Sequence, residues 1–134
     1  LVENGYVPVV SSLASDAEGN VLNVNADTVA SVLAVDLKAA KLISLTTVPG
    51  LLRDPKDPAS LVSRLTLPEA RAALAAGWVS GGMRPKIQSL VQAVEGGVEA
   101  GHILSGLEEN ALLLELFTNQ GVGTLVERGE GPPS

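Results

Sequence analysis

Apolar positions along the chain form two patterns, short runs rich in β-branched residues and longer segments with helical spacing. The short runs predict strands near residues 7–11, 21–25, 42–46, 102–105 and 122–126. The longer segments predict helices near residues 27–38, 67–76, 86–95 and 110–117. Strands that alternate with helices favour an α/β fold, in which a mainly parallel sheet is sandwiched between helices. In such folds, ligands bind where the carboxyl ends of the strands lead into helices.

The first 25 residues predict an antiparallel exception to this arrangement. Residues 6–12 form an apolar, β-branched run that indicates a buried strand, and residues 21–25 indicate a second one. Between them, Asp16-Ala17-Glu18-Gly19-Asn20 has the composition of a turn. The sequence therefore predicts an N-terminal hairpin with a long tip.

Several helix ends and one loop carry local signals. Thr66-Leu67-Pro68-Glu69 has the spacing of a capping box, and Gly77 is placed to end the helix that follows. Gly96-Gly97 is placed to end the next helix. Two prolines and two aspartates in residues 53–58 predict a loop.

Composition indicates one folded domain. The chain has 134 residues, of which 46% are hydrophobic and 18% charged, so a substantial core can form. We expect this domain to cover residues 1–127 and residues 128–134 to be a flexible tail with nothing to bury. Every apolar stretch is interrupted long before the length of a membrane span, and the first residues do not resemble a secretory signal. We therefore expect a cytoplasmic protein.

Charge and residue usage narrow the possible chemistry. The chain has no cysteine, which excludes thiolate zinc sites, and a single histidine, His102, which excludes metal sites built from several histidines. A net charge of −6 and 2% aromatic residues disfavour nucleic-acid binding. His102 leads an apolar strand, so we expect it to be structural.

Polar clusters at three element ends, residues 23–27, 46–50 and 80–86, are the candidate sites. In the first cluster, strand alternation places Asn23 and Asn25 on one side, and Asp27 follows where a helix begins. Asp27 could simply cap that helix, with Asn25 in a turn. Alternatively, the two amides and the carboxylate converge on a ligand beside the helix N-terminus.

The third cluster combines two glycines with a lysine. Gly81 and Gly82 allow backbone N–H groups to approach an anion, and Lys86 lies in the first turn of the next helix. A cation there opposes the helix dipole, which an intervening anion would explain. The alternative is a surface lysine with an extended side chain. Trp78, just before the cluster, could be a core residue or one wall of a base-binding pocket.

Four ordered motifs resemble the carboxyl-terminal half of acetylglutamate kinase, a family with the amino acid kinase fold. They are Glu3 to Ser12, Asn23-Val24-Asn25-Ala26-Asp27, Ser80-Gly81-Gly82-Met83-x-Pro85-Lys86, and the ending from Leu112 to Thr124. The resemblance implies phosphorylation of the side-chain carboxylate of N-acetyl-L-glutamate by ATP with Mg²⁺, in arginine biosynthesis.

The resemblance also implies roles for individual residues. Asn23 would hold the α-substituents of the substrate, Asp27 would orient the catalytic lysines, and Lys86 would stabilise the transferring phosphoryl group. The residues expected against the nucleotide are Thr47, Val48, Pro49, Gly50, Leu51, Leu52, Trp78, Val79 and Ser80. Thr47 stands where the family commonly has Asp. No residue is expected to bind a metal directly.

The resemblance begins at the second half of the family, so further partners are implied. The amino-terminal half would bring another glycine-rich loop, a second lysine and the arginine that grips the substrate carboxylate. The expected partners are therefore that half, the small-molecule substrate and other copies in a homo-oligomer, and the chain alone should be inactive. Two alternatives stay open: a kinase acting on carrier-protein-linked aminoadipate in lysine biosynthesis, and a non-catalytic module that binds a nucleotide or a regulator.

Overall fold

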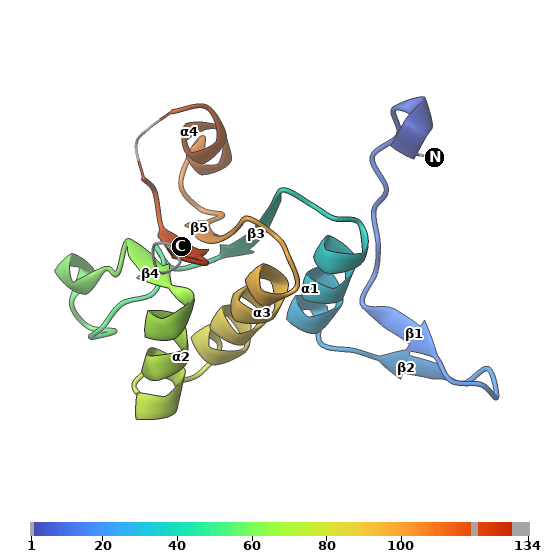
Figure 1. The fold of residues 1–134 in the computed structure, drawn as a ribbon, viewed down its shortest axis with the longest axis horizontal. Coiled ribbons are helices and arrows are strands. Elements are labelled where there is room, and N and C mark those ends of the chain that lie inside the picture. Colours follow the sequence, from blue (N-terminus) through green and yellow to red (C-terminus); the bar gives the residue numbers. More distant parts are fainter. Residues whose placement is uncertain (1, 119–120, 130–134) are drawn as a thin grey trace, which may run out of the picture.

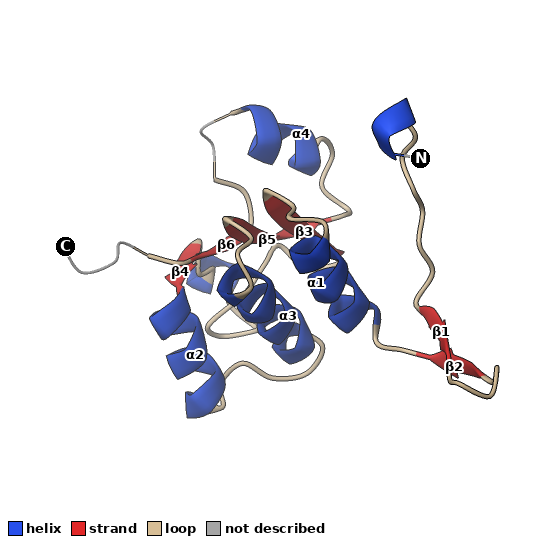
Figure 2. Cartoon of the chain, turned by 45° about the vertical axis from the view of Figure 1, so that its right-hand side comes forward, coloured by secondary structure: helices blue, strands red, loops and turns tan. Residues whose placement is uncertain are grey.

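The computed structural model describes residues 2–118 and 121–129 (Figure 1) and contains a four-stranded sheet with the order β3-β5-β6-β4 (Figure 2). The strands are β3 (Lys41–Thr46), β5 (Ala100–Ser105), β6 (Thr124–Glu127) and β4 (Arg64–Thr66). β5 pairs with β3 in parallel and with β6 antiparallel, whereas β4 and β6 are parallel. Two of the three pairings are therefore parallel, as predicted for the sheet.

Helices cover both faces of this sheet, which confirms the predicted α/β sandwich. α1 (Ala26–Asp36), α2 (Leu67–Ala76) and α3 (Met83–Glu95) lie on one face (Figures 1 and 2). The shorter α4 (Ala111–Phe117) lies on the other face. Two single-turn 3₁₀ helices, η1 (Val2–Asn4) and η2 (Pro58–Ser60), complete the described elements.

The main core lies between α3 and the sheet. Ile87, Leu90 and Val94 repeat along one face of α3 and are completely buried, as are Ile103 and Val126 on the strands. Gly101 lets α3 approach closely, because a Cβ atom at this position would lie 2.9 Å from Cδ2 of Leu90. The spacing of apolar residues on α3 thus holds this helix, which begins at the third polar cluster, against the sheet.

The predicted caps of α2 are confirmed. The Glu69 carboxylate accepts a hydrogen bond from the Thr66 backbone N–H at 2.8 Å, and Thr66 Oγ1 accepts from the Glu69 N–H at 3.5 Å. Gly77 ends the helix with a φ of 79°, in the left-handed region that glycine adopts without strain. These signals are local, so the sequence alone is enough to place them.

The hairpin exists, but the prediction of its first strand is wrong. β1 (Leu13–Ser15) pairs antiparallel with β2 (Val21–Asn23), whereas residues 7–11 form no strand, and Val9 is 96% exposed. A β-branched run becomes a strand only when another strand satisfies its backbone. Among the described residues, none pairs with residues 7–11.

Other differences are smaller. β4 was not predicted, because three residues are too few to show a period, and the last strand begins at Thr124 rather than near residue 122. Arg128, in the predicted tail, donates a hydrogen bond to the Val94 carbonyl at 3.0 Å. Residues 130–134 of that tail lie outside the described residues.

Candidate functional site

A pocket of about 330 Å³ lies between the segment that follows β3 and the start of α3. It is lined by Thr46, Thr47, Val48, Gly50, Leu51, Leu52, Pro55, Trp78, Ser80, Gly82, Met83 and Lys86. Most of the residues expected to contact the nucleotide therefore line this pocket, and so does Lys86. Pro49 and Val79 do not line the pocket, and Val79 is only 1% exposed because it packs in the core.

The wall that follows β3 is anchored by a buried threonine from the far end of the chain. Thr124 Oγ1 accepts a hydrogen bond from the Leu51 N–H at 2.8 Å and donates one to the Val62 carbonyl at 2.7 Å. Gly50 passes so close that a Cβ atom would lie 2.7 Å from the same oxygen. No local pattern connects Thr124 with this loop, because the two are 73 positions apart in the chain.

Trp78 contributes to both the core and the pocket. Its partly buried ring packs against the main core and also lines the cavity. The guanidinium of Arg53 lies 4.9 Å from the ring centroid, within the range of a cation–π contact. Trp78 is therefore both a core residue and a wall of the pocket, and binding of a base there stays a prediction.

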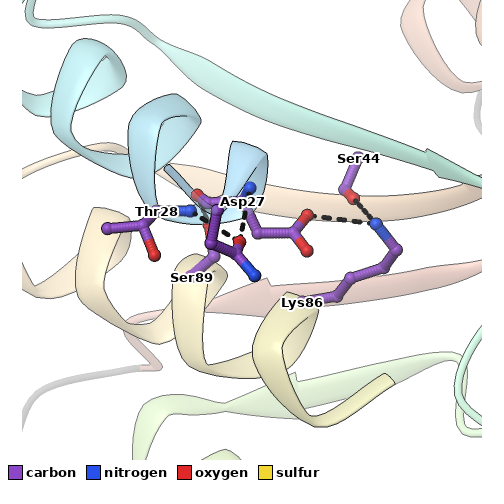
Figure 3. Close-up of polar contacts among 6 residues, drawn as sticks. Asp27, Thr28, Ser44, Lys86 and Ser89 are labelled. Carbon is purple, nitrogen blue, oxygen red and sulfur yellow. Dashed lines mark hydrogen bonds and ion pairs between the residues drawn. The ribbon is translucent and has the colours of Figure 1, made fainter. Parts of the chain in front are cut away.

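The structure brings Asp27 and Lys86 together. Lys86 Nζ lies 3.0 Å from Asp27 Oδ1, and each side chain is 22% exposed (Figure 3). The Ser44 hydroxyl, on β3, lies 3.4 Å from the same ammonium. Lys86 is therefore held between a carboxylate and a hydroxyl at the edge of the pocket, and it is not an extended surface lysine.

Asp27 is free to pair with Lys86 because another residue caps α1. Asn25 Oδ1 accepts hydrogen bonds from the backbone N–H groups of Asp27 at 2.9 Å and Thr28 at 3.3 Å. The interpretation in which Asp27 caps the helix is therefore wrong. Ser89, on α3, donates a hydrogen bond to the Asp27 carbonyl at 2.6 Å. Neither Ser44 nor Ser89 can be singled out from the sequence, because serines inside a strand or helix carry no motif.

Asn23 lies on β2 of the hairpin, whereas Asp27 and Lys86 lie on helices. It is exposed at the end of β2 and pairs with Leu13 in the hairpin. In residues 2–118 and 121–129, no hydrogen bond or ion pair joins its side chain to Asp27 or Lys86. Its expected contact with a substrate stays a prediction.

His102 is structural, as expected. Its ring is 3% exposed, and Nδ1 lies 2.7 Å from Glu115 Oε1 on α4, although the two groups are not aligned for a hydrogen bond. Burial lowers the pKa of His102, the Glu115 carboxylate opposes this effect, and Lys41 adds to it. Glu115 Oε2 also accepts from the Val122 N–H at 3.0 Å, so the glutamate joins α4, β5 and the approach to β6.

Two further findings concern only the described part of the chain. It contains no group of three or more His, Cys, Asp or Glu side chains that could hold a metal ion. It also contains no helix with the length and apolar composition needed to cross a membrane.

Sequence comparison identifies the family. The model of the amino acid kinase family matches residues 1–105, so the chain belongs to this family. It is 50% identical over 132 residues to an acetylglutamate kinase from Methanosarcina barkeri, covering 98% of this chain and 41% of the relative. For an acetylglutamate kinase from Synechococcus sp. (strain RCC307), identity is 52% over 126 residues, covering 94% and 43%. The chain thus spans about two fifths of the length of these relatives.

Solved structures show the same fold. N-acetylglutamate synthase from Neisseria gonorrhoeae, complexed with coenzyme A and L-arginine, superposes with a TM-score of 0.85 at 32% identity. That match covers 95% of this chain and 29% of the synthase chain. Carbamate kinase from Giardia lamblia superposes with a TM-score of 0.70 at 21% identity, covering 87% of this chain and 39% of the other, and shares the fold alone.

Proposed function

We propose that this chain is the ATP-binding part of an acetylglutamate kinase, an enzyme of arginine biosynthesis that phosphorylates the side-chain carboxylate of N-acetyl-L-glutamate. The observation that carries the proposal is the Asp27–Lys86 ion pair beside the pocket, in a chain about half identical to enzymes of that name. The same pocket holds most of the residues that the resemblance assigns to the nucleotide.

The residues of the pocket suit a nucleotide. Val48, Leu51 and Trp78 offer apolar surface to a base, and the volume of about 330 Å³ falls in the range of small-molecule sites. Gly82, at the start of α3, leaves the backbone open to a phosphate, and no side chain caps this helix. The Lys86 ammonium supplies the positive charge there.

The chemistry needs no general base, because a carboxylate acceptor is already ionised at neutral pH. Rate enhancement then comes from alignment of the reactants and from stabilisation of charge on the phosphoryl oxygens. Lys86 provides that charge, and Asp27 and Ser44 fix the position of its ammonium. Mg²⁺ would neutralise nucleotide phosphates and be held mainly by them, since the described residues offer no carboxylate cluster.

The acceptor side would be completed outside this chain. In this proposal Asn23 binds the α-substituents of the substrate. The other contacts to the substrate come from the rest of the polypeptide found in the longer relatives. The exposed apolar run that includes Val7 and Val9 would pack against that part. The chain alone would bind nucleotide without turnover, and the complete enzyme would be a homo-oligomer.

A second candidate is a non-catalytic module. The likeness to N-acetylglutamate synthase supports it, because this fold there forms part of a protein named for a different reaction. The two candidates differ in what they require of Lys86: a kinase needs the ammonium during phosphoryl transfer, whereas a module that only binds does not.

Calorimetry with ADP and a chimeric enzyme test the proposal. The 134-residue chain should bind ADP weakly, Trp78→Ala should abolish this binding, and the exposed aromatic variant Phe117→Ala should not change it. A chimera in which this chain replaces the matching segment of the Methanosarcina barkeri relative should phosphorylate N-acetyl-L-glutamate in a coupled assay. Nucleotide binding with an inactive chimera would favour the module, and no binding at millimolar ADP would refute both.

A further inference from the structure

Two side chains of α3 contact the same residue at the start of α1, Asp27. Lys86 and Ser89 are three positions apart, so they lie on one face of α3. Lys86 Nζ contacts the Asp27 carboxylate at 3.0 Å, and Ser89 Oγ donates to the Asp27 backbone carbonyl at 2.6 Å (Figure 3). Ser89 is 6% exposed, so water hardly competes for this hydrogen bond.

The second contact holds the backbone of Asp27, whereas the ion pair holds its side chain. A carbonyl oxygen has two lone pairs, so it can accept both its helical N–H partner and the Ser89 hydroxyl. With its backbone held, Asp27 can move its carboxylate only by rotation of its own side chain. The Lys86 ammonium has three N–H donors, of which the Asp27 carboxylate and the Ser44 hydroxyl engage two.

A second hydrogen bond between the same helices offers a comparison. Ser31, on α1, is fully buried, and its hydroxyl lies 3.0 Å from Gln92 Oε1 on α3. The single hydroxyl hydrogen can be donated either to this oxygen or to the Thr28 carbonyl, within the same helix, at 2.9 Å. Ser31 therefore joins the two helices one turn beyond Asp27 but does not touch the ion pair.

We propose that Ser89 is a positioning residue that sets the place of the Asp27 carboxylate and, through it, of the Lys86 ammonium. This inference rests on the proposed kinase function of the site. Ser89 itself is not among the residues that line the pocket, so its substitution leaves the pocket lining unchanged. Its effect is on the alignment of charge during phosphoryl transfer, where displacements below 1 Å reduce the rate.

Kinetics of the chimera test this role. Ser89→Ala should lower kcat about five- to tenfold, as loss of one buried hydrogen bond predicts, and leave KM for ATP within about twofold. The matched variant Ser31→Ala should keep kcat within about twofold. In a Lys86→Ala background, Ser89→Ala should have almost no further effect, because the group that it positions is gone. Equal losses in both backgrounds, or from both serine variants, would overturn the proposal.

A structural measurement separates this inference from the proposed function. Hydrogen exchange of the 134-residue chain should become at least threefold faster at the start of α1 in Ser89→Ala, and Ser89→Thr, which keeps the hydroxyl, should restore protection. If the unsubstituted chimera is inactive but this exchange changes as expected, the positioning contact stands and the kinase function fails. Unchanged exchange in Ser89→Ala would refute the contact itself.

Discussion

The Asp27 carboxylate and the Lys86 ammonium lie 3.0 Å apart although 59 residues separate them in the chain. The pair joins the first turn of α1 to the first turn of α3, beside the pocket. Both side chains keep partial contact with water, and such ion pairs contribute little to folding. The main effect of the contact is therefore to position the Lys86 ammonium, not to stabilise the fold.

Removal of the Lys86 charge should affect turnover more than nucleotide binding. In the chimera, Lys86→Ala should lower kcat by about 10²- to 10³-fold and change KM for ATP much less, because the ammonium interacts most strongly with charge that develops in the transition state. Steady-state kinetics measure both constants. Lys38→Asn is the control, since exposed Lys38 lies outside the pocket with a φ of 51°, which asparagine tolerates. A kcat within a few-fold of the parent in Lys86→Ala would contradict the assigned role.

The buried His102 should make the fold sensitive to mild acid. Burial lowers the pKa of His102 below 6.5, so the unfolded chain takes up a proton at a higher pH than the folded chain does. The stabilising contribution is complete above pH 6.5 and is lost as the pH falls toward the lowered pKa. The free energy of unfolding from urea titrations should decrease between pH 7.5 and 5.5, by at most about 1.4 kcal/mol per pH unit for this one group.

A variant isolates this histidine from other groups. His102→Gln removes the titrating ring, so its free energy of unfolding should change less between the same two pH values, whatever its absolute stability. Glu115, which faces the ring at 2.7 Å, is present in both proteins, so the comparison isolates the ring itself. An equally steep loss of stability in His102→Gln would show that another group titrates.

Two glycines in one segment should respond differently to an added methyl group. Gly123 has a φ of 78°, and a Cβ atom there would overlap the backbone carbonyl oxygen of Ile103 on β5. Gly123→Ala should therefore reduce the free energy of unfolding by about 3 kcal/mol. Gly121→Ala, where no atom lies within 4 Å of the added carbon, should change it by less than about 1 kcal/mol. Urea denaturation compares the two, and equal effects would contradict the described packing of this segment on β5.

Local features of this protein were determined by the sequence itself. The capping box at Thr66, the left-handed end at Gly77 and the apolar face of α3 depend on residues a few positions apart, so their physics is contained in short windows. The alternation of these elements was enough for an α/β sandwich. The motifs that resemble acetylglutamate kinase also singled out Asp27, Lys86 and most of the pocket wall.

Only the tertiary structure decided which distant groups meet. The contacts of Asp27 with Lys86 and Ser89, and of Thr124 with the segment after β3, depend on how α1, α3 and β6 are placed by the sheet. The exposed run at residues 7–11 also depends on distant groups, because its residues favour a strand but no neighbouring strand pairs with it in the described residues. Secondary-structure propensity depends on neighbours a few residues away, whereas the arrangement of all elements decides which groups a buried side chain or a strand can contact. In this chain that arrangement joins α3 to α1 at Asp27.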